Sequence, residues 1–240
     1  MQSNIYVALS AQLSLQRRLD TLANNVANVN TVGYRGEEVS FEELVSPSNK
    51  DPVSFVSKGD NHISTKGGEV TQTGNPLDVA IRGDAWLAIQ TPTGVAYTRD
   101  GRMEMTKEGG LTTLEGYPVL DAGGVPVQLN PDDPPPTINK AGTIEQNGNN
   151  LGALGLYRMP QGAKLTRAEG VSVVSDLPPV AELDFLHNGV QQGFVEKSNI
   201  NPILEMTHLI TLQRNFQAVS TLLSDTESSL TDSLKTLAGS

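Results

Sequence analysis

The chain begins and ends with long stretches that contain no proline and almost no glycine. No Pro occurs before Pro47, none follows Pro202, and the last Gly, Gly239, is the only one after that residue. Because proline and glycine interrupt helices, both ends of the chain are free to form long helices. Eighteen of the 23 Gly lie between Gly59 and Gly170, which places the turn-rich part of the chain in its middle.

Apolar residues recur at both ends with alternating spacings of three and four, the pattern of a coiled-coil seam. The faces opposite these seams carry few charges, which is typical of helices that neighbours cover on several sides. We therefore expect the two helices to pair, and to become ordered mainly when other copies pack around them. The predicted seam residues are Ile5, Leu15, Leu19, Leu22 and Val26 in the first helix, and Leu209, Leu212, Phe216, Val219, Leu223 and Leu230 in the second.

A polar segment, Asn24 to Gly36, follows the first seam and is rich in Asn and Gly. These residue types tolerate left-handed backbone geometry and end helices, so the segment predicts a helix end followed by a turn. Its counterpart near the other end is Ser198 to Pro202. There Asn201 is a candidate helix N-cap, and Pro202 suits the first helical position.

Short apolar runs separated by glycines fill the middle, among them 77–81, 85–90, 95–99 and 111–114. Short strands at this spacing are typical of an antiparallel sandwich or barrel. The expected fold class is α+β, in which N- and C-terminal helices pair as a coiled-coil-like helical domain and a central antiparallel β-rich domain is inserted between them. We expect a discontinuous helical domain at 1–36 and 196–240, an extended connector at 37–75 and the β-rich domain at 76–195.

Composition excludes several classes of protein. The formal charge is −10, from 27 acidic and 17 basic residues, and no Lys/Arg cluster occurs, so nucleic acid is not an expected partner. No apolar run approaches the roughly 18 residues of a transmembrane helix, and no conventional signal peptide is predicted. The chain has 0 Cys, which excludes disulfides and thiolate metal sites.

A search for reactive groups gives no catalytic site. The three histidines, His62, His187 and His208, are far apart in the sequence and have no second ligand at helical spacing. No nucleophile elbow, phosphate-binding loop or dinucleotide fingerprint is present. Trp86 and Tyr97 are most simply core residues or cross-strand partners. We therefore expect no enzyme, no cofactor and no metal.

Leu22 to Tyr34 at one end of the chain, and Ser198 to Met206 with Gln213 to Phe216 near the other, resemble the two end signatures of the bacterial flagellar rod and hook proteins. Together with a middle motif they follow one order along nearly the whole chain. Between the two end signatures, Leu77 to Trp86 and Tyr97 to Arg102 resemble the central β domain of the longer members. Length, the residues at the start and Arg35 favour the proximal-rod type over the distal-rod type or a hook-like subunit. The residues that match the end signatures are Asn24, Asn25, Asn28, Thr31, Gly33 and Tyr34 at the N-terminal end, and Asn199, Glu205, Met206, Gln213 and Arg214 at the C-terminal end.

The resemblance implies a structural subunit of the flagellar basal-body rod in the periplasmic space. Such a subunit passes through the gate of the flagellar type III export apparatus and assembles helically with copies of itself and other rod proteins to transmit torque. Its helices line the inner tube and its β domain forms an outer layer. Phe41-Glu42-Glu43-Leu44-Val45 resembles the export signal of such subunits. The alternative is that Phe41 and Val45 only anchor this segment on a neighbouring element.

Two functions from other classes stay open from the residues alone. One is a β-rich binding module on a coiled-coil stalk, such as an adhesin or a phage tail part. The other is an enzyme with an unfamiliar site. The binding module also predicts long terminal helices, but only a rod subunit requires both termini to pack around one channel.

Overall fold

A computed structural model describes residues 2–41, 43–46, 53–57 and 59–238. They form two compact units, each treated by itself below. The helix–hairpin unit comprises Met1–Ala27, Glu37–His62 and Asn201–Ser240, and the sheet unit comprises Asn28–Gly36 and Ile63–Ile200.

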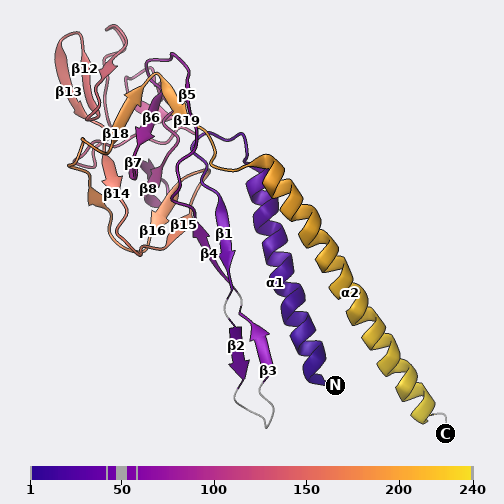
Figure 1. Cartoon of the computed structure of the whole chain (residues 1–240). Helices are drawn as coiled ribbons and strands as arrows, with labels where there is room; N and C mark the ends of the chain where they lie inside the picture. Colours follow the sequence, from indigo (N-terminus) through magenta and orange to yellow (C-terminus); the bar gives the residue numbers. More distant parts are fainter. Residues whose placement is uncertain (1, 42, 47–52, 58, 239–240) are drawn as a thin grey trace. The chain divides into compact units, whose positions relative to one another are not determined.

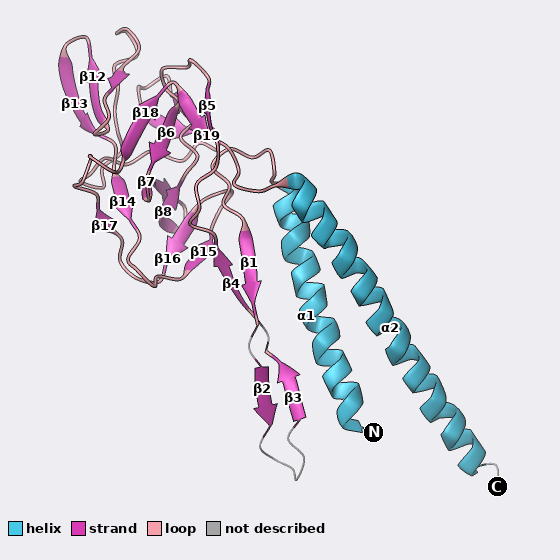
Figure 2. Cartoon of the chain, in the orientation of Figure 1, coloured by secondary structure: helices cyan, strands magenta, loops and turns pink. Residues whose placement is uncertain are grey.

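Two helices dominate the helix–hairpin unit: α1 (Gln2–Ala27, 26 residues) and α2 (Pro202–Ala238, 37 residues). They run side by side in opposite directions (Figure 2). A hydrogen bond of 3.2 Å from the Gln12 amide to the Ser220 hydroxyl links them. Asn201 caps α2 as predicted, because its side-chain oxygen accepts hydrogen bonds from the backbone nitrogens of Ile203 and Leu204 at 3.1 and 3.2 Å.

The seam residues with described side chains are all half-buried, and none is fully buried. The predicted seam positions Ile5 and Leu230 lie outside the described side chains. A two-helix contact covers one side of each helix and leaves the rest open to solvent. Apolar residues elsewhere on the helices, such as Leu13, Ile203 and Leu222, are more than half exposed. The pair therefore leaves much of its apolar surface uncovered.

Four short strands accompany the helices. β1 (Glu37–Ser40) pairs with β4 (Asp60–Ile63), and β2 (Glu43–Ser46) pairs antiparallel with β3 (Val53–Val56). α1 contacts both β1 and β3 (Figure 1). The predicted fold class is wrong on this point. Two helices do flank an antiparallel β-rich region, but the helices do not form a helical domain of their own, because their compact unit also contains the strands between Glu37 and His62.

The sheet unit is built around one antiparallel sheet of six strands in the order β15-β16-β8-β7-β14-β17. The predicted runs coincide with strands to within about two residues. The bounds in this sheet are β7 Ala85–Thr91, β8 Gly94–Thr98, β14 Leu156–Arg158, β15 Leu165–Arg167, β16 Val173–Ser175 and β17 Val180–Ala181.

Smaller antiparallel sheets complete this unit (Figure 1), in place of a single sandwich or barrel. Two of these sheets pair the strands β5 and β6 with the last two strands before α2, so both ends of the unit meet. The pairs are β5 (Val70–Gln72) with β19 (Phe194–Glu196), β6 (Val79–Arg82) with β18 (Gly189–Gln192), β9 (Met103–Met105) with β10 (Leu111–Thr113), and β11 (Thr137–Ile138), β12 (Thr143–Gln146) and β13 (Asn149–Ala153).

The core of the sheet unit consists of two clusters. The larger one includes Ile81, Leu87 and Ile144, and the smaller one joins Ile63, Trp86, Leu165 and Val173. Because β7 lies between two neighbours in the sheet and both its faces are covered, nearly all its residues are buried. That explains why its sequence is almost continuously apolar rather than alternating.

Candidate functional site

The N-terminal signature forms a tight turn within the sheet unit. The backbone nitrogen and hydroxyl of Thr31 donate to the carbonyl and side-chain oxygens of Asn28 at 3.1 and 3.2 Å. Gly33 has φ +70°, a conformation that glycine adopts without strain. A Cβ at this position would lie 2.2 Å from the backbone nitrogen of Asp100. The turn therefore needs glycine both for its backbone angle and for space.

The residues that follow the turn lead to a buried charge cluster around Glu196, the last residue of β19. One carboxylate oxygen of Glu196 lies 2.7 Å from the Arg35 guanidinium, and the other lies 2.7 Å from that of Arg99. The three side chains are only 2–3% exposed. The backbone nitrogen of Gly68 donates to the same carboxylate at 2.8 Å, and that of Gly33 donates to the Glu196 carbonyl at 2.7 Å. We call Arg35, Arg99 and Glu196 the arginine–glutamate clamp.

Backbone carbonyls satisfy much of the remaining hydrogen-bonding capacity of the clamp. Arg99 donates to the carbonyls of Ile81, Gly83 and Ala85 on and beside β6 and β7. Arg35 donates to the carbonyls of Thr65 and Lys66. Such bonds matter because a buried charge without partners is strongly destabilising.

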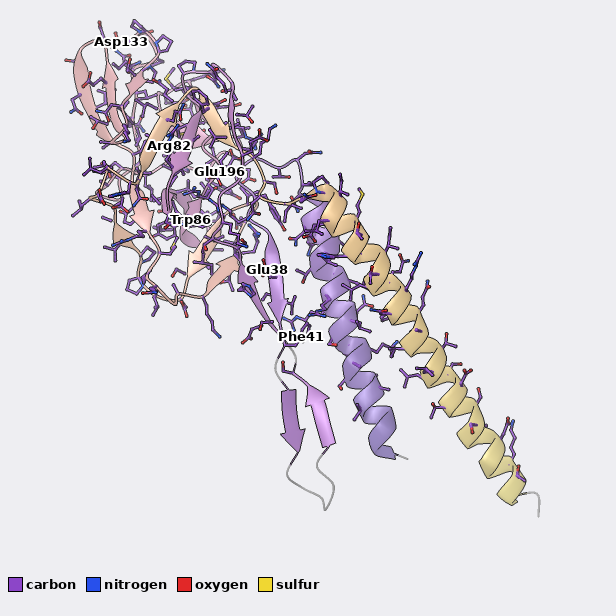
Figure 3. All side chains as sticks on the ribbon, viewed as in Figure 1. Glu38, Phe41, Arg82, Trp86, Asp133 and Glu196 are labelled. Carbon is purple, nitrogen blue, oxygen red and sulfur yellow. The ribbon has the colours of Figure 1, made fainter. Side chains whose placement is uncertain are left out.

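Two cations share one carboxylate in the clamp, and the pKa values reflect this. Burial, and after it the neighbouring Arg99 charge, lower the pKa of Arg35 to about 10, although the Glu196 carboxylate acts in the opposite direction. Burial also lowers the pKa of Arg99, against the attraction of Glu196. The Trp86 ring, with both guanidinium carbons 5.9 Å from its centre, adds a cation–π contact to each. Figure 3 labels Trp86 and Glu196 within the sheet region.

The clamp brings together three distant segments of the sequence: the end of the N-terminal turn at Arg35, the central strands that carry Trp86 and Arg99, and the end of β19 at Glu196. A cavity of about 580 Å³ lies beside it, lined in part by Arg35, Trp86, Arg99 and Arg158. The guanidinium groups of the clamp already bind a carboxylate and backbone carbonyls, and neither acts as a proton donor near neutral pH. Chemically, the clamp is suited to holding segments together.

Other signature residues also bond to the backbone. The Asn199 side chain accepts from the backbone nitrogen of Gly36 at 2.8 Å and donates to the Lys66 carbonyl at 3.0 Å. Tyr34 is buried, and the Arg167 guanidinium lies 4.5 Å from the centre of its ring. Asn199 therefore satisfies backbone groups from two other segments of the sheet unit.

Asn25 has the same role in the helix–hairpin unit. It is buried near the end of α1, where its amide donates to the Glu37 carbonyl and its oxygen accepts from the Glu37 backbone nitrogen, both at 2.9 Å. This pair of bonds fixes the start of β1 to the helix. Asn24, one residue earlier, is exposed.

A groove of about 650 Å³ lies between α1, α2 and β1 in the helix–hairpin unit. Leucines form much of its apolar surface: Leu15 and Leu22 from α1, and Leu204 and Leu212 from α2. Its charged lining is mainly acidic and consists of Glu37, Glu38, Glu205, Arg18 and His208. One carboxylate oxygen of Glu205 is buried and has no hydrogen-bond partner among the described residues. We call this feature the acidic groove.

The remaining signature residues, Met206, Gln213 and Arg214, are exposed on α2. The structure does not bring them to the clamp or among the residues that line the acidic groove. Phe41, from the predicted export signal, lies beside α1 (Figure 3), with the Arg18 guanidinium 5.0 Å from its ring centre. The backbone of Val45 is in β2, and its side chain lies outside those described.

The histidines take part in local contacts. His62 lies 3.3 Å from the Glu38 carboxylate, and His187 lies 2.8 Å from that of Asp184. Within the part of the chain that the structure describes, no three His, Asp or Glu side chains are grouped to hold a metal ion. Neither α1 nor α2, over its described residues, is long and apolar enough to cross a membrane.

Sequence reasoning missed Glu196 as a member of the clamp. It lies between Val195 and Lys197 in the sequence, where a glutamate normally faces solvent. A usable signal was Arg35 directly after the Gly-aromatic pair, because an arginine next to a buried turn requires an acceptor. That signal does not identify which carboxylate supplies the acceptor.

Models of three protein families match the chain in the same order as the motifs. "Flagella basal body rod protein" matches residues 5–35, "Flagellar hook protein FlgE/F/G D1 domain" matches residues 80–146, and "Flagellar basal body rod FlgEFG protein C-terminal" matches residues 191–236. The clamp residues Arg35, Arg99 and Glu196 fall one in each of these matched regions.

The relatives that match the chain along its full length are also flagellar rod proteins. The chain is 48% identical to the flagellar basal-body rod protein FlgF of Mesorhizobium japonicum, over 99% of this chain and 98% of that protein. It is 46% identical to FlgF of Rhizobium meliloti over 100% of both chains. Similarity to the rod protein FlgG of Bacillus subtilis is lower, at 29% over 95% of this chain and 96% of that protein. The chain therefore belongs to the FlgF family of flagellar basal-body rod proteins.

Proposed function

We propose that this chain is a structural subunit of the proximal part of the flagellar rod and catalyses no reaction. The observation that carries the proposal is that the regions matched by all three family models meet at one buried carboxylate, Glu196. A subunit that transmits torque has to resist shear between its segments, and a buried ionic clamp with fixed hydrogen bonds provides rigid cross-connections. Identity of 46–48% with FlgF proteins along the full chain supports the proximal type.

The proposal includes assembly with other rod subunits and with copies of the same chain. It is supported by the half-buried seams of α1 and α2, which leave apolar surface for neighbours to cover. The predicted division stays part of the proposal: residues 1–36 and 196–240 contribute to the inner tube, 37–75 connect, and 76–195 form the outer layer. The exposed signature residues Met206, Gln213 and Arg214 are available for contacts between subunits.

The proposal also covers the route and the place of assembly. The chain leaves the cytoplasm through the flagellar type III export gate, with Phe41 and Val45 as part of the signal, and joins the rod in the periplasmic space. In the folded chain Phe41 is half-buried beside Arg18. A signal at this position would therefore be read before the chain folds.

Deletion of the gene tests the function. The deletion strain should not swim, and its purified basal bodies should lack a complete rod when viewed by electron microscopy. A plasmid copy of the wild-type gene should restore both. A deletion strain that builds normal rods and swims would contradict the proposal. A strain that builds rods but does not swim would place the chain outside the rod and in another step of motility.

A further inference from the structure

The acidic groove contains an incomplete interaction. Among the described residues, the inner oxygen of the Glu205 carboxylate accepts no hydrogen bond although it is buried. Glu37 and Glu38 line the same groove, against Arg18 and His208 as basic residues. A buried carboxylate without a partner is costly. The groove is therefore suited to an occupant that carries a cation beside apolar side chains.

The same chain carries a surface of the opposite character on α2. Ile203, Met206 and Ile210 are 78%, 52% and 52% exposed, and the exposed Arg214 follows one turn later. Arg214 has no hydrogen-bond or ion-pair partner within the described residues. We call Ile203, Met206, Ile210 and Arg214 the outer ridge. The outer ridge combines an apolar stripe with one cation. The stripe suits the leucines of the acidic groove, and the cation suits the Glu205 carboxylate that has no partner there.

Helix geometry prevents the ridge from filling the groove of its own chain. Arg214 follows Glu205 by nine residues, which is about two and a half helical turns at roughly 100° per residue. The two side chains therefore leave α2 on opposite sides. Glu205 points toward the side where α1 and β1 lie, and the ridge points away from it. An ion pair between them requires two molecules.

We propose that the outer ridge of one copy docks into the acidic groove of the next copy, where Arg214 pairs with the unpartnered Glu205 carboxylate. The two surfaces differ and lie on opposite sides of one helix, so each copy presents a free groove on one side and a free ridge on the other. Such a head-to-tail contact gives a ring if its rotation closes and an open helical array if it does not, and the proposed rod function requires the helical array. This inference rests on the proposed rod function and names the partner and the residues of the contact.

Charge reversal tests the contact in cells. Glu205→Arg alone and Arg214→Glu alone each place like charges together and should reduce the number of copies incorporated per basal body by at least about tenfold. The double variant, Glu205→Arg with Arg214→Glu, restores opposite charges and should recover incorporation and swimming. Asp225→Arg, an exposed reversal on α2 outside both surfaces, is the matched control and should incorporate normally.

Cross-linking tests the same contact directly, because the chain has 0 Cys. Rods from cells that make both a Glu205→Cys and an Arg214→Cys copy should give a dimer with a short bis-maleimide reagent. Rods that contain Glu205→Cys with Asp225→Cys should give much less of it. Unchanged far-ultraviolet circular dichroism of the purified variants excludes misfolding as the cause, and Glu205→Gln, which keeps the shape of the side chain, should weaken incorporation in the same direction.

Each outcome separates the inference from the proposed function. If the single reversals incorporate normally, or if the double variant stays as defective as the singles, the pairing is wrong even when the deletion strain lacks rods. A cross-link from Glu205→Cys to a different rod protein, and not to a second copy, also overturns it. If the deletion strain swims, the proposed function itself fails.

Discussion

Glu196→Gln is the sharpest test of the arginine–glutamate clamp. The carboxylate binds Arg35 and Arg99 at 2.7 Å each and accepts from Gly68 at 2.8 Å. Glutamine keeps one acceptor oxygen, replaces the other with a donor and removes the negative charge. One arginine then faces an amide donor, and the two buried cations repel each other without a counter-charge.

The loss of stability expected for Glu196→Gln depends on the hydrogen bonds that the two arginines keep. Breaking a buried ion pair by changing one partner costs about 3–5 kcal/mol. Arg99 keeps its bonds to the carbonyls of Ile81, Gly83 and Ala85, and Arg35 keeps those to Thr65 and Lys66. We therefore expect the lower end, about 3 kcal/mol. Because the free energy of unfolding of a domain is typically about 5–15 kcal/mol, this is a large fraction of the stability of the sheet unit.

Urea unfolding measures this loss through Trp86, the only Trp in the chain, whose ring centre lies 5.9 Å from both guanidinium carbons. At a typical slope of about 1–3 kcal/mol per molar urea, the midpoint should fall by roughly 1–3 M. Glu104→Gln, at an exposed position in β9, is the control and should change stability by less than about 0.5 kcal/mol. Equal midpoints for Glu196→Gln and the wild type would refute the clamp as a stabilising element.

Three further predictions follow from the same structure. Gly33→Ala should destabilise the sheet unit by more than about 2 kcal/mol, because it adds a clash with the Asp100 backbone to the strain of φ +70°. The control Gly74→Ala has a similar φ of +77° but no atom within 4 Å of the added Cβ, and should cost only about 1 kcal/mol. Equal urea midpoints for the two variants would argue against the clash. Leu223→Asp, at a half-buried seam position, should weaken the α1–α2 pair by about 1–3 kcal/mol and lower the thermal midpoint of the helical circular dichroism signal. Leu222→Asp, at a position that is 65% exposed, should leave this midpoint near the wild-type value. A lower midpoint for Leu222→Asp than for Leu223→Asp would contradict the seam assignment. Burial, and after it the neighbouring Tyr157, raise the pKa of Tyr97, so the unfolded state loses this proton at a lower pH than the folded state and the free energy of unfolding should fall as pH rises from 10 through the folded pKa. Urea melts at a series of pH values should show a smaller alkaline loss for Tyr97→Phe than for the wild type. The same dependence of stability on pH in both proteins would show that Tyr97 titrates normally.

The sequence predicted the elements whose limits depend on local chemistry. α2 begins at Pro202 behind an asparagine cap, and β7 and β8 lie where the glycine-separated apolar runs are. These signals act over a few residues, so one chain is enough to see them. The turn at Gly33 belongs to the same class, because a Gly after an Asn-rich helix end indicates positive φ.

The features that the sequence did not predict depend on contacts with residues far away in the chain. β1 and β2 are short and acidic, and their contacts are with other elements of the chain: β1 with β4 and α1, and β2 with β3, which itself contacts α1. The predicted fold class failed there for that reason. Glu196 likewise gives no local indication of burial, because its environment is supplied by Arg35 and Arg99 from two distant segments. Single-sequence periodicity carries no information on such pairings.

The connection between the two ends of the sheet unit has a consequence for when the chain folds. Gly36 binds Asn199 across 163 residues, and Arg35 binds Glu196 within the same region. During synthesis the N-terminal end emerges first, so the turn at Gly33 has no Glu196 to bind until nearly the whole unit has been made. Contacts of such long range also form slowly, because closing a long loop costs entropy before any bond forms. The clamp therefore cannot form until the last strand of the sheet unit, β19, is available to supply Glu196.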